Sequence, residues 1–457
     1  MMRTTIASLL LAAIACGQSI RTEAAPLLLI SIDGLHPRYV TQSRDPSLQI
    51  PNLRSFLEEG AYAEGVVAVV PTVTYPNHTT LVTGVSPSKH GILSNTTFDP
   101  LGKNREGWYW YAEDIKVPTL WSAAAAAKMS TASVNWPVTI GDRNIQYLLP
   151  EFWRASTPDD LKLIRALGRP EGLVAQMEAK LGPFVDGYTG TVDSDRVRTQ
   201  FAVALLKDRK PDLLAVHLIA LDEIEHENGP FLATAYRTLS ELDRMIGDLT
   251  QAALASHPDS VVAIVSDHGF IATHTAVNLR TRFVQAGLIK LKQAANAAAA
   301  PTIESWDAQV WPGGASAAVM LQKPGDAAVK ARVAALLNDL KSDSRNGIAR
   351  VLDSKQTAAS GGFAGADFVV EFAPGFYLGT SLHGNLLEPA ASRGTHGYLP
   401  DREEMHSSFF IKGRGVAKAK ALGVIDMNQI APTLAAVLGV GLPTAEGSAM
   451  AISSSVK

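Results

Sequence analysis

Continuous apolar runs alternating with amphipathic helical patterns constrain this 457-residue chain more than any other feature of its sequence. Runs such as LLLISI at 27–32, LLAVHLIAL at 213–221 and VVAIVS at 261–266 have the length and composition of buried strands. In the segment 231–254, apolar residues recur every three or four positions, which is typical of a helix. Strands that are apolar on both sides need helices on both faces. The sequence therefore predicts an α/β fold with a mostly parallel central sheet.

The composition favours one large domain. Hydrophobic residues make up 46% of the chain, which supplies ample apolar material for a buried core. We expect this domain to cover residues 25–457. An alanine-rich stretch at 290–306 indicates a boundary or a surface excursion, and an inserted or cap-like, less regular subregion is expected within about 275–393.

Residues 1–24 have the pattern of an export signal, with an early arginine, an apolar stretch at 6–15 and then small residues. The apolar stretch is too short to span a bilayer. An alternative is a bacterial lipoprotein signal in which Cys16 becomes the lipidated first residue. Cys16 is the only cysteine, so no disulfide framework is expected. We expect a periplasmic or secreted protein, with membrane contact only if Cys16 is lipidated.

The charge balance bears on the class of partner. The formal net charge is −3 at pH 7, so the chain lacks the basic excess that long nucleic acids or anionic membranes require. A small-molecule ligand is favoured over a nucleic acid polymer. The sequence does not define an oligomeric state.

Three of the predicted strands are each followed by an aspartate. Asp33 follows the run at 27–32, Asp222 follows the run at 213–221, and Asp267 follows Ser266. One such residue could simply cap a helix or begin a turn. If the strands are neighbours, however, all three carboxylates meet at the carboxyl edge of the sheet, where open α/β folds build their sites. Their mutual repulsion then requires cations.

Three histidines complete a set of metal-binding side chains. His226 lies four residues after Asp222, so on a helix the two side chains share a face, while His268 follows Asp267 directly. His396 lies between small residues in GTHGY. Three aspartates and three histidines suit two divalent ions with mixed nitrogen and oxygen ligands. Zinc is the first choice, and manganese and iron remain open.

The stretch PTVTYPNHTTLVTGVSP at 71–87 is rich in threonine and follows the apolar run GVVAVV at 65–70, which is expected to contain a strand at 66–70. A threonine hydroxyl is a weak nucleophile unless a metal or a base activates it. The stretch is interpreted as a turn entering a helix whose N-terminus favours an anion. We expect one threonine to attack and the others to be turn or cap residues. Asn95 is either a turn residue or an amide donor to a phosphate oxygen.

The segments ISIDG, PTVTYPNHTTLVTG, SKHGILSN, LDEIEH, VSDHGF and THGY together resemble the alkaline phosphatase superfamily. They are most similar to its nucleotide pyrophosphatase/phosphodiesterase family, occur in the family's order, and bracket most of the chain. The resemblance implies an alkaline-phosphatase-like fold and a hydrolase that cleaves nucleotide-type phosphodiesters or diphosphates. The implied product is a nucleoside monophosphate, formed through a phosphothreonine intermediate.

The resemblance also implies roles for individual residues. Two zinc ions are expected per chain, with Thr74 as the nucleophile activated at one of them, and Asn95 as a phosphate-binding residue. The implied ligands are Asp33, Asp267 and His268 for one ion, and Asp222, His226 and His396 for the other. In nucleotide-cleaving members two aromatic residues stack on the base, and the matching positions are Tyr75 and Trp153. The alternative for Trp153 is core or lid packing.

Other functions remain as alternatives. The family also contains lipid-cleaving members, so a choline phosphodiester is a second substrate class. A related monoesterase class adds a Lys/Arg pair near the phosphate; Arg143 could supply the arginine, but position 141 is glycine rather than lysine. A non-enzymatic, exported zinc-binding protein is the remaining alternative. It would require a missing ligand or nucleophile, whereas all are present.

Overall fold

The computed structural model describes residues 24–104, 107–152, 158–184, 189–292 and 301–453. The signal-like residues 1–23, which include Cys16, and the predicted base-stacking residue Trp153 lie outside the described residues. Among the helices that the structure describes, none combines the length and the apolar character needed to cross a membrane.

An eight-stranded sheet forms the centre of the larger part of the molecule. In spatial order its strands are β20 (Lys420–Ala421), β2 (Ala61–Tyr62), β19 (Phe409–Gly413), β7 (Val261–Val265), β1 (Leu27–Ile32), β6 (Leu213–Leu218), β4 (Thr131–Val134) and β5 (Tyr147–Leu149). The run β7-β1-β6-β4-β5 is parallel, and β19 pairs antiparallel with β7. The predicted α/β fold with a mostly parallel sheet is confirmed.

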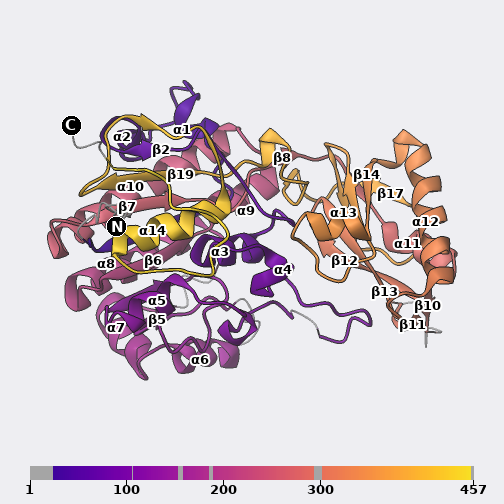
Figure 1. The fold of residues 1–457 in the computed structure, drawn as a ribbon, viewed down its shortest axis with the longest axis horizontal. Helices are drawn as coiled ribbons and strands as arrows, with labels where there is room; N and C mark the ends of the chain where they lie inside the picture. Colours follow the sequence, from indigo (N-terminus) through magenta and orange to yellow (C-terminus); the bar gives the residue numbers. More distant parts are fainter. Residues whose placement is uncertain (1–23, 105–106, 153–157, 185–188, 293–300, 454–457) are drawn as a thin grey trace, which may run out of the picture.

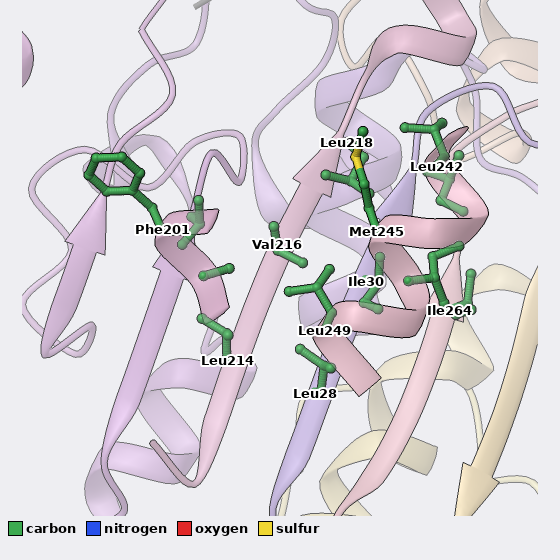
Figure 2. Packing of buried hydrophobic residues seen from close by; sticks show 14 of the residues in the cluster. Leu28, Ile30, Phe201, Leu214, Val216, Leu218, Leu242, Met245, Leu249 and Ile264 are labelled. Carbon is green, nitrogen blue, oxygen red and sulfur yellow. The ribbon is translucent and has the colours of Figure 1, made fainter. Parts of the chain in front are cut away.

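The continuous apolar runs are explained by burial on both faces of this sheet. Every residue of β1, β6 and β7 is buried. Ile30 of β1 points into the core under α10 (Ala233–Ser256), where it lies near Met245 and Leu249 (Figure 2). Its neighbour Leu29 belongs to a second core, which includes residues of α14 (Ile430–Leu438). Alternate residues of one strand therefore pack into two cores, so both faces favour apolar residues. Ser31 of β1 and His217 of β6 are buried polar exceptions.

The helices form a layer on each face of the sheet. The first core contains residues of α2 (Pro51–Glu59), α8 (Val192–Arg209) and α10, and the second contains residues of α3 (Thr74–Thr83), α5 (Leu120–Ala126) and α14. The predicted helical segment 231–254 corresponds to α10, which has an apolar face that packs on β1. The sheet is thereby covered on both faces, with the carboxyl ends of its parallel strands at one edge.

Residues 275–393, here called the small lobe, build sheets of their own and gather to one side of the main sheet (Figure 1). Its largest sheet has the antiparallel order β12 (Ala308–Gly313), β13 (Ser316–Leu321), β15 (Phe368–Phe372) and β14 (Ile348–Asp353). Residues of α12 (Ala327–Ser342) share a separate apolar core with this sheet. The smaller strands β9 (Thr275–Val277), β16 (Phe376–Leu378) and β17 (Leu387–Pro389) form a three-stranded sheet beside it.

Candidate active site

Asp33, Asp267 and His268 form a first group of side chains at the ends of two paired strands. Because β1 and β7 are parallel neighbours, the residues that follow them emerge at the same edge of the sheet. The chain turns at Gly34, whose φ is +75° and whose N–H donates to Asp267 Oδ1 at 3.2 Å. His268 Nε2 lies 3.0 Å from Asp267 Oδ2 and 3.4 Å from Asp33 Oδ1. All three side chains are buried.

Asp222, His226 and His396 form a second group. The first two lie one turn apart on α9 (Ala220–Asn228), as their spacing predicts, and His226 Nε2 is 3.6 Å from Asp222 Oδ2. His396 follows the short strand β18 (Gly394–Thr395), and its Nε2 lies 3.8 Å from Asp222 Oδ1. In each of the two groups, one donor atom per residue lies within 4.8 Å of the others.

Hydrogen bonds fix the orientation of the two imidazoles in the second group. His226 Nδ1 lies 2.9 Å from the carbonyl oxygen of Gly394, and His396 Nδ1 lies 3.0 Å from that of Thr72. A carbonyl oxygen only accepts, so each Nδ1 carries the proton and donates it. Each Nε2 then keeps a lone pair that faces Asp222. This is the tautomer that a metal ligand requires.

The two groups adjoin each other and form one candidate site. The imidazole rings of His268, from the first group, and His396, from the second, stack with centroids 3.6 Å apart and planes 9° from parallel. The structure thus brings together all six side chains that the sequence nominates as ligands, although they come from positions spread between 33 and 396.

Several buried atoms of the two groups make no well-directed hydrogen bond among the described residues, although His268 Nε2 and Asp267 Oδ2 are within ion-pair distance. These buried atoms are Asp33 Oδ1, Asp222 Oδ1, Asp267 Oδ2 and both ring nitrogens of His268. Buried polar atoms are costly when they are unpaired. A divalent cation in each group would satisfy them, and mixed carboxylate and imidazole donors suit zinc. The residues present therefore fit the two ions that the sequence predicts.

The charge environment of the carboxylates also favours a bound cation. Burial raises the pKa of the Asp33 carboxyl well above its usual range, and the carboxylates of Asp267 and Asp222 raise it further. Burial also opposes ionisation of Asp267, but His268 and His78 outweigh it and lower the pKa of this carboxyl below its ordinary value. Burial lowers the pKa of His396, and the neighbouring His268 and His226 lower it further. Burial lowers the pKa of His268, but the Asp267 carboxylate outweighs it and raises this pKa above its ordinary value. A bound cation would replace that proton in balancing the crowded carboxylates.

Thr74 is the first residue of α3 and is half-buried. Its carbonyl oxygen accepts a hydrogen bond from His78 Nδ1 at 2.9 Å, and the same nitrogen lies 3.7 Å from Asp267 Oδ2. Asn77 supports the preceding turn, because its side chain bonds to Val69 N, Pro71 O and Val73 O. The start of α3 is therefore tied directly to the first group.

Asn95 lies beside the start of the same helix. Its Oδ1 accepts the N–H of Tyr75 at 2.9 Å, which fixes the amide plane. No hydrogen bond of its amide nitrogen is found among the described residues. This arrangement leaves the two N–H groups of Asn95 free to donate to an anion at the N-terminus of α3.

Tyr75 is arranged differently from the expected base-stacking residue. Its side chain is 1% exposed and its hydroxyl donates to Glu151 Oε1 at 2.8 Å. The rings of Trp108 and Trp110 lie against it, with centroids 5.1 and 6.2 Å away. A base cannot stack on a ring that is covered in this way. The half-buried Trp108 is the more accessible aromatic residue of this cluster.

Sequence reasoning missed two residues next to the metal-binding groups, His217 and Glu151. His217 Nε2 lies 3.0 Å from Asp33 Oδ2, and its Nδ1 lies 3.4 Å from Glu151 Oε2. The sequence feature that could have revealed them is the histidine in the middle of the otherwise apolar β6, because a polar side chain there needs a buried partner. Arg143, considered for a monoesterase site, lines a surface hollow with Thr131 and Tyr147. These two residues begin β4 and β5, so Arg143 lies at the edge of the sheet opposite the two metal-binding groups.

Comparisons with known proteins indicate a family and a fold. A family model described as type I phosphodiesterase / nucleotide pyrophosphatase matches residues 27–399. Ectonucleotide pyrophosphatase/phosphodiesterase family member 1 of Homo sapiens is 24% identical over 259 residues, which are 54% of this chain and 24% of that protein. Bis(5'-adenosyl)-triphosphatase of Mus musculus is 32% identical over 131 residues, 27% of each chain. The match thus spans about a quarter of the length of these curated relatives.

Solved structures with the same fold include murine ectonucleotide pyrophosphatase/phosphodiesterase 5. Its TM-score is 0.65 at 18% identity, and the superposition covers 93% of this chain and 97% of that one. An inactive variant of the same murine protein in complex with AMP gives a TM-score of 0.66 with the same coverage and identity.

Proposed function

The chain belongs to the type I phosphodiesterase / nucleotide pyrophosphatase family, and from this premise we propose that it is a zinc-dependent hydrolase of nucleotide-type phosphodiesters and diphosphates. The product would be a nucleoside monophosphate. The observation that carries the proposal is the meeting of two aspartate and histidine groups, each with its donor atoms within 4.8 Å, beside the start of α3. The partner would be a small phosphodiester rather than a nucleic acid polymer.

Each group would hold one zinc ion. Asp33, Asp267 and His268 would bind the first, and Asp222, His226 and His396 the second. Bound cations would neutralise the three carboxylates, polarise the phosphate oxygens and favour the ionised form of the Thr74 hydroxyl.

Thr74 would attack the phosphorus atom. Its Oγ1 forms the new P–O bond while the bond to the leaving alcohol or phosphate breaks, which gives a phosphothreonine. Water then attacks this ester in line and releases the nucleoside monophosphate, which restores Thr74. A threonine-to-alanine variant of the murine relative is described as inactive and in complex with AMP, which supports a threonine nucleophile and a nucleotide ligand.

Asn95 would orient the phosphate. Its amide N–H groups donate to a non-bridging oxygen, while Tyr75 N holds its Oδ1. The dipole of α3 favours the same negative charge at its N-terminus. The Asn95 donors and this dipole require no rearrangement during the reaction, and that preorganisation is the usual source of a large rate effect.

We also propose the cellular setting and domain plan. The signal-like residues 1–24 favour export to the periplasm or the exterior, with a lipidated Cys16 as the alternative. Residues 25–457 would form one catalytic domain into which the small lobe is inserted. This plan is supported by the separate sheets of residues 275–393.

The decisive experiment compares four nitrophenyl substrates: the ester of thymidine 5'-monophosphate, bis-nitrophenyl phosphate, nitrophenyl phosphate and the ester of phosphocholine. We expect the highest kcat/KM on the thymidine diester. A preference for nitrophenyl phosphate would favour the monoesterase alternative, and a preference for the phosphocholine ester would favour a lipid headgroup. No turnover of any of the four by zinc-loaded protein would support the non-enzymatic alternative.

A further inference from the structure

Glu371 is a fully buried carboxylate in the small lobe, on β15, and two arginines converge on it. Arg350 of the neighbouring strand β14 contacts Oε2, and Arg402 Nε donates to Oε1 at 2.7 Å. The N–H of Leu399 also donates to Oε1, at 3.1 Å. We call Glu371, Arg350 and Arg402 the Glu371 clamp.

The clamp joins two parts of the chain. Glu371 and Arg350 are register partners in the sheet of the small lobe. Leu399, Asp401 and Arg402 belong instead to the segment that directly follows His396. Arg350 reaches this segment a second time, because both of its terminal nitrogens donate to the Asp401 carboxylate at 2.6 Å.

The segment between His396 and the clamp has little freedom. The carbonyl oxygen of His396 accepts the N–H of Ala315 at 2.9 Å, and the hydroxyl of Tyr398 donates to Phe376 O at 2.8 Å. Gly397 has a φ of +94°, and an added Cβ would lie only 2.0 Å from the carbonyl oxygen of Gly313. The backbone of the small lobe therefore packs so closely that only glycine fits there.

The other side of His396 rests on the larger part of the molecule. Thr72 O accepts from His396 Nδ1, while Thr72 Oγ1 accepts the N–H of Gly397 at 3.0 Å and donates to Tyr398 O at 2.7 Å. His396 is thus held between a turn next to Thr74 and the small lobe. The other five nominated ligands follow β1 and β7 or lie on α9. His226 of α9 contacts the last residues of the small lobe, because its carbonyl oxygen accepts from Ser392 Oγ at 2.9 Å and from Arg393 N at 2.7 Å. These contacts lie outside the segment that joins His396 to Glu371.

From these contacts we infer that the Glu371 clamp positions His396, so that the small lobe completes the second metal-binding group but not the first. The inference rests on the proposed two-ion function. Glu371 and Arg402 act through His396 and are therefore positioning residues. An ion in the second group would in turn tie the small lobe to α9.

The test is a zinc titration of the full-length protein against a chromophoric chelator, which resolves the two affinities. For Glu371→Gln we expect the second site to bind roughly 10- to 100-fold more weakly, with the first site unchanged. Arg402→Gln removes one arm of the clamp and leaves Glu371 paired with Arg350, so it tests the same point in a milder variant. Hydrogen exchange at 394–402 should rise in both variants.

Arg345→Gln is the matched control. It removes an ion pair with Asp343 in the small lobe, but its side chain is 86% exposed and is not part of the clamp. We expect both zinc affinities to stay at their wild-type values in this variant.

The possible failures can be told apart. If the wild-type protein holds two ions and both clamp variants retain both affinities, or weaken both sites equally, the positioning role is wrong while the proposed function stands. If Glu371→Gln does not fold, the Arg402→Gln titration decides by the same two criteria. A wild-type protein with fewer than two ions contradicts the proposed site and the inference together.

Discussion

At the scale of single residues, two neighbouring threonines have different environments. The hydroxyl of Thr72 is buried and bonded on both sides to the segment after His396. Thr74 is half-buried at the start of α3, where its hydroxyl can meet an anion. The division between a structural and a reactive hydroxyl therefore follows from position and not from residue type.

This division leads to a first prediction. Thr74→Ala should lower kcat on the thymidine diester by a factor on the order of 10⁴ or more, because it removes the attacking atom. Zinc content and the unfolding midpoint should stay close to wild type. Thr74→Ser keeps a hydroxyl and should retain measurable turnover with a covalent phosphoserine. Turnover by Thr74→Ala at a rate near wild type would refute the nucleophile assignment.

A second residue-scale prediction concerns His90, which is buried and belongs to neither metal-binding group. Its Nδ1 accepts the N–H of Ile92 at 3.1 Å, and its Nε2 lies 3.2 Å from Thr80 Oγ1. Burial lowers the pKa of His90 from 6.5 to about 3. At a pH between these two pKa values, His90 of the unfolded chain binds a proton, whereas His90 of the folded chain does not. The free energy of unfolding therefore has its full value with respect to His90 above pH 6.5. As the pH falls from 6.5 toward 3, it decreases by up to about 1.4 kcal/mol per pH unit.

The measurement is urea unfolding of the wild type and His90→Gln at pH 7 and pH 5. The fall in unfolding free energy from pH 7 to pH 5 should be smaller in the variant, because it lacks this proton uptake. An equal fall in both proteins would contradict the prediction.

At the scale of elements, the turn that ends β1 sets the position of Asp33. Gly34 has a φ of +75°, and an added Cβ would lie 2.9 Å from Phe270 Cε2 and 3.0 Å from Glu225 Oε2. Gly34→Ala should therefore destabilise the protein by about 1–3 kcal/mol and lower zinc binding at the first site.

Gly102→Ala is the control for this third prediction. Its φ is +64°, but nothing lies within 4 Å of an added Cβ. It shares the backbone cost, about 1 kcal/mol, without the collision. Urea unfolding and zinc titration of both variants separate the two effects. Equal losses in the two variants would exclude a collision at Gly34.

The same elements explain how far the sequence could predict the site. Asp33 and Asp267 follow strands that are buried on both faces, and such strands are recognisable from composition alone. The pairing of Glu151 with Tyr75 and His217 could not be predicted, because it joins three elements that are distant in the chain. Residue type suggested an open ring at position 75, whereas the tertiary contacts bury it.

One predicted strand was longer than the observed one. The apolar run 66–70 is a strand only at its start, in β3 (Gly65–Val67), which pairs with β21 (Val424–Asp426). Further on, the N–H of Val69 donates to Asn77 Oδ1 at 2.9 Å instead of to a strand. The side chain of a polar residue in the following helix thus replaces the ladder, which apolar periodicity alone does not reveal.

At the scale of the whole molecule, the candidate site concentrates negative charge at the carboxyl edge of the main sheet. Asp33 and Asp267 are buried and Asp222 is half-buried, and loss of hydration works against the charge on each of the three. If only the folded chain binds zinc, the free energy of unfolding rises with the logarithm of the ratio of free zinc concentration to Kd.

The fourth prediction is that chelation lowers both activity and the unfolding temperature. At a free zinc concentration 1,000 times Kd, one site contributes about 4 kcal/mol, so removal of zinc should produce a shift of several degrees. Differential scanning calorimetry with and without chelator measures this shift, and added zinc should reverse it. A metal-free protein with full activity would contradict the proposed mechanism.

The strand order β19-β7-β1-β6 also determines at which stage of protein synthesis the metal-binding groups can first assemble. β1 lies between two strands that emerge from the ribosome more than 180 residues later, and His396 is made later still. A nascent chain therefore carries Asp33 and Thr74 for most of its synthesis without the partners that would shape a binding site. The first group is complete once His268 has been made, whereas the second must wait for His396, so the two groups become able to bind an ion at different stages of synthesis.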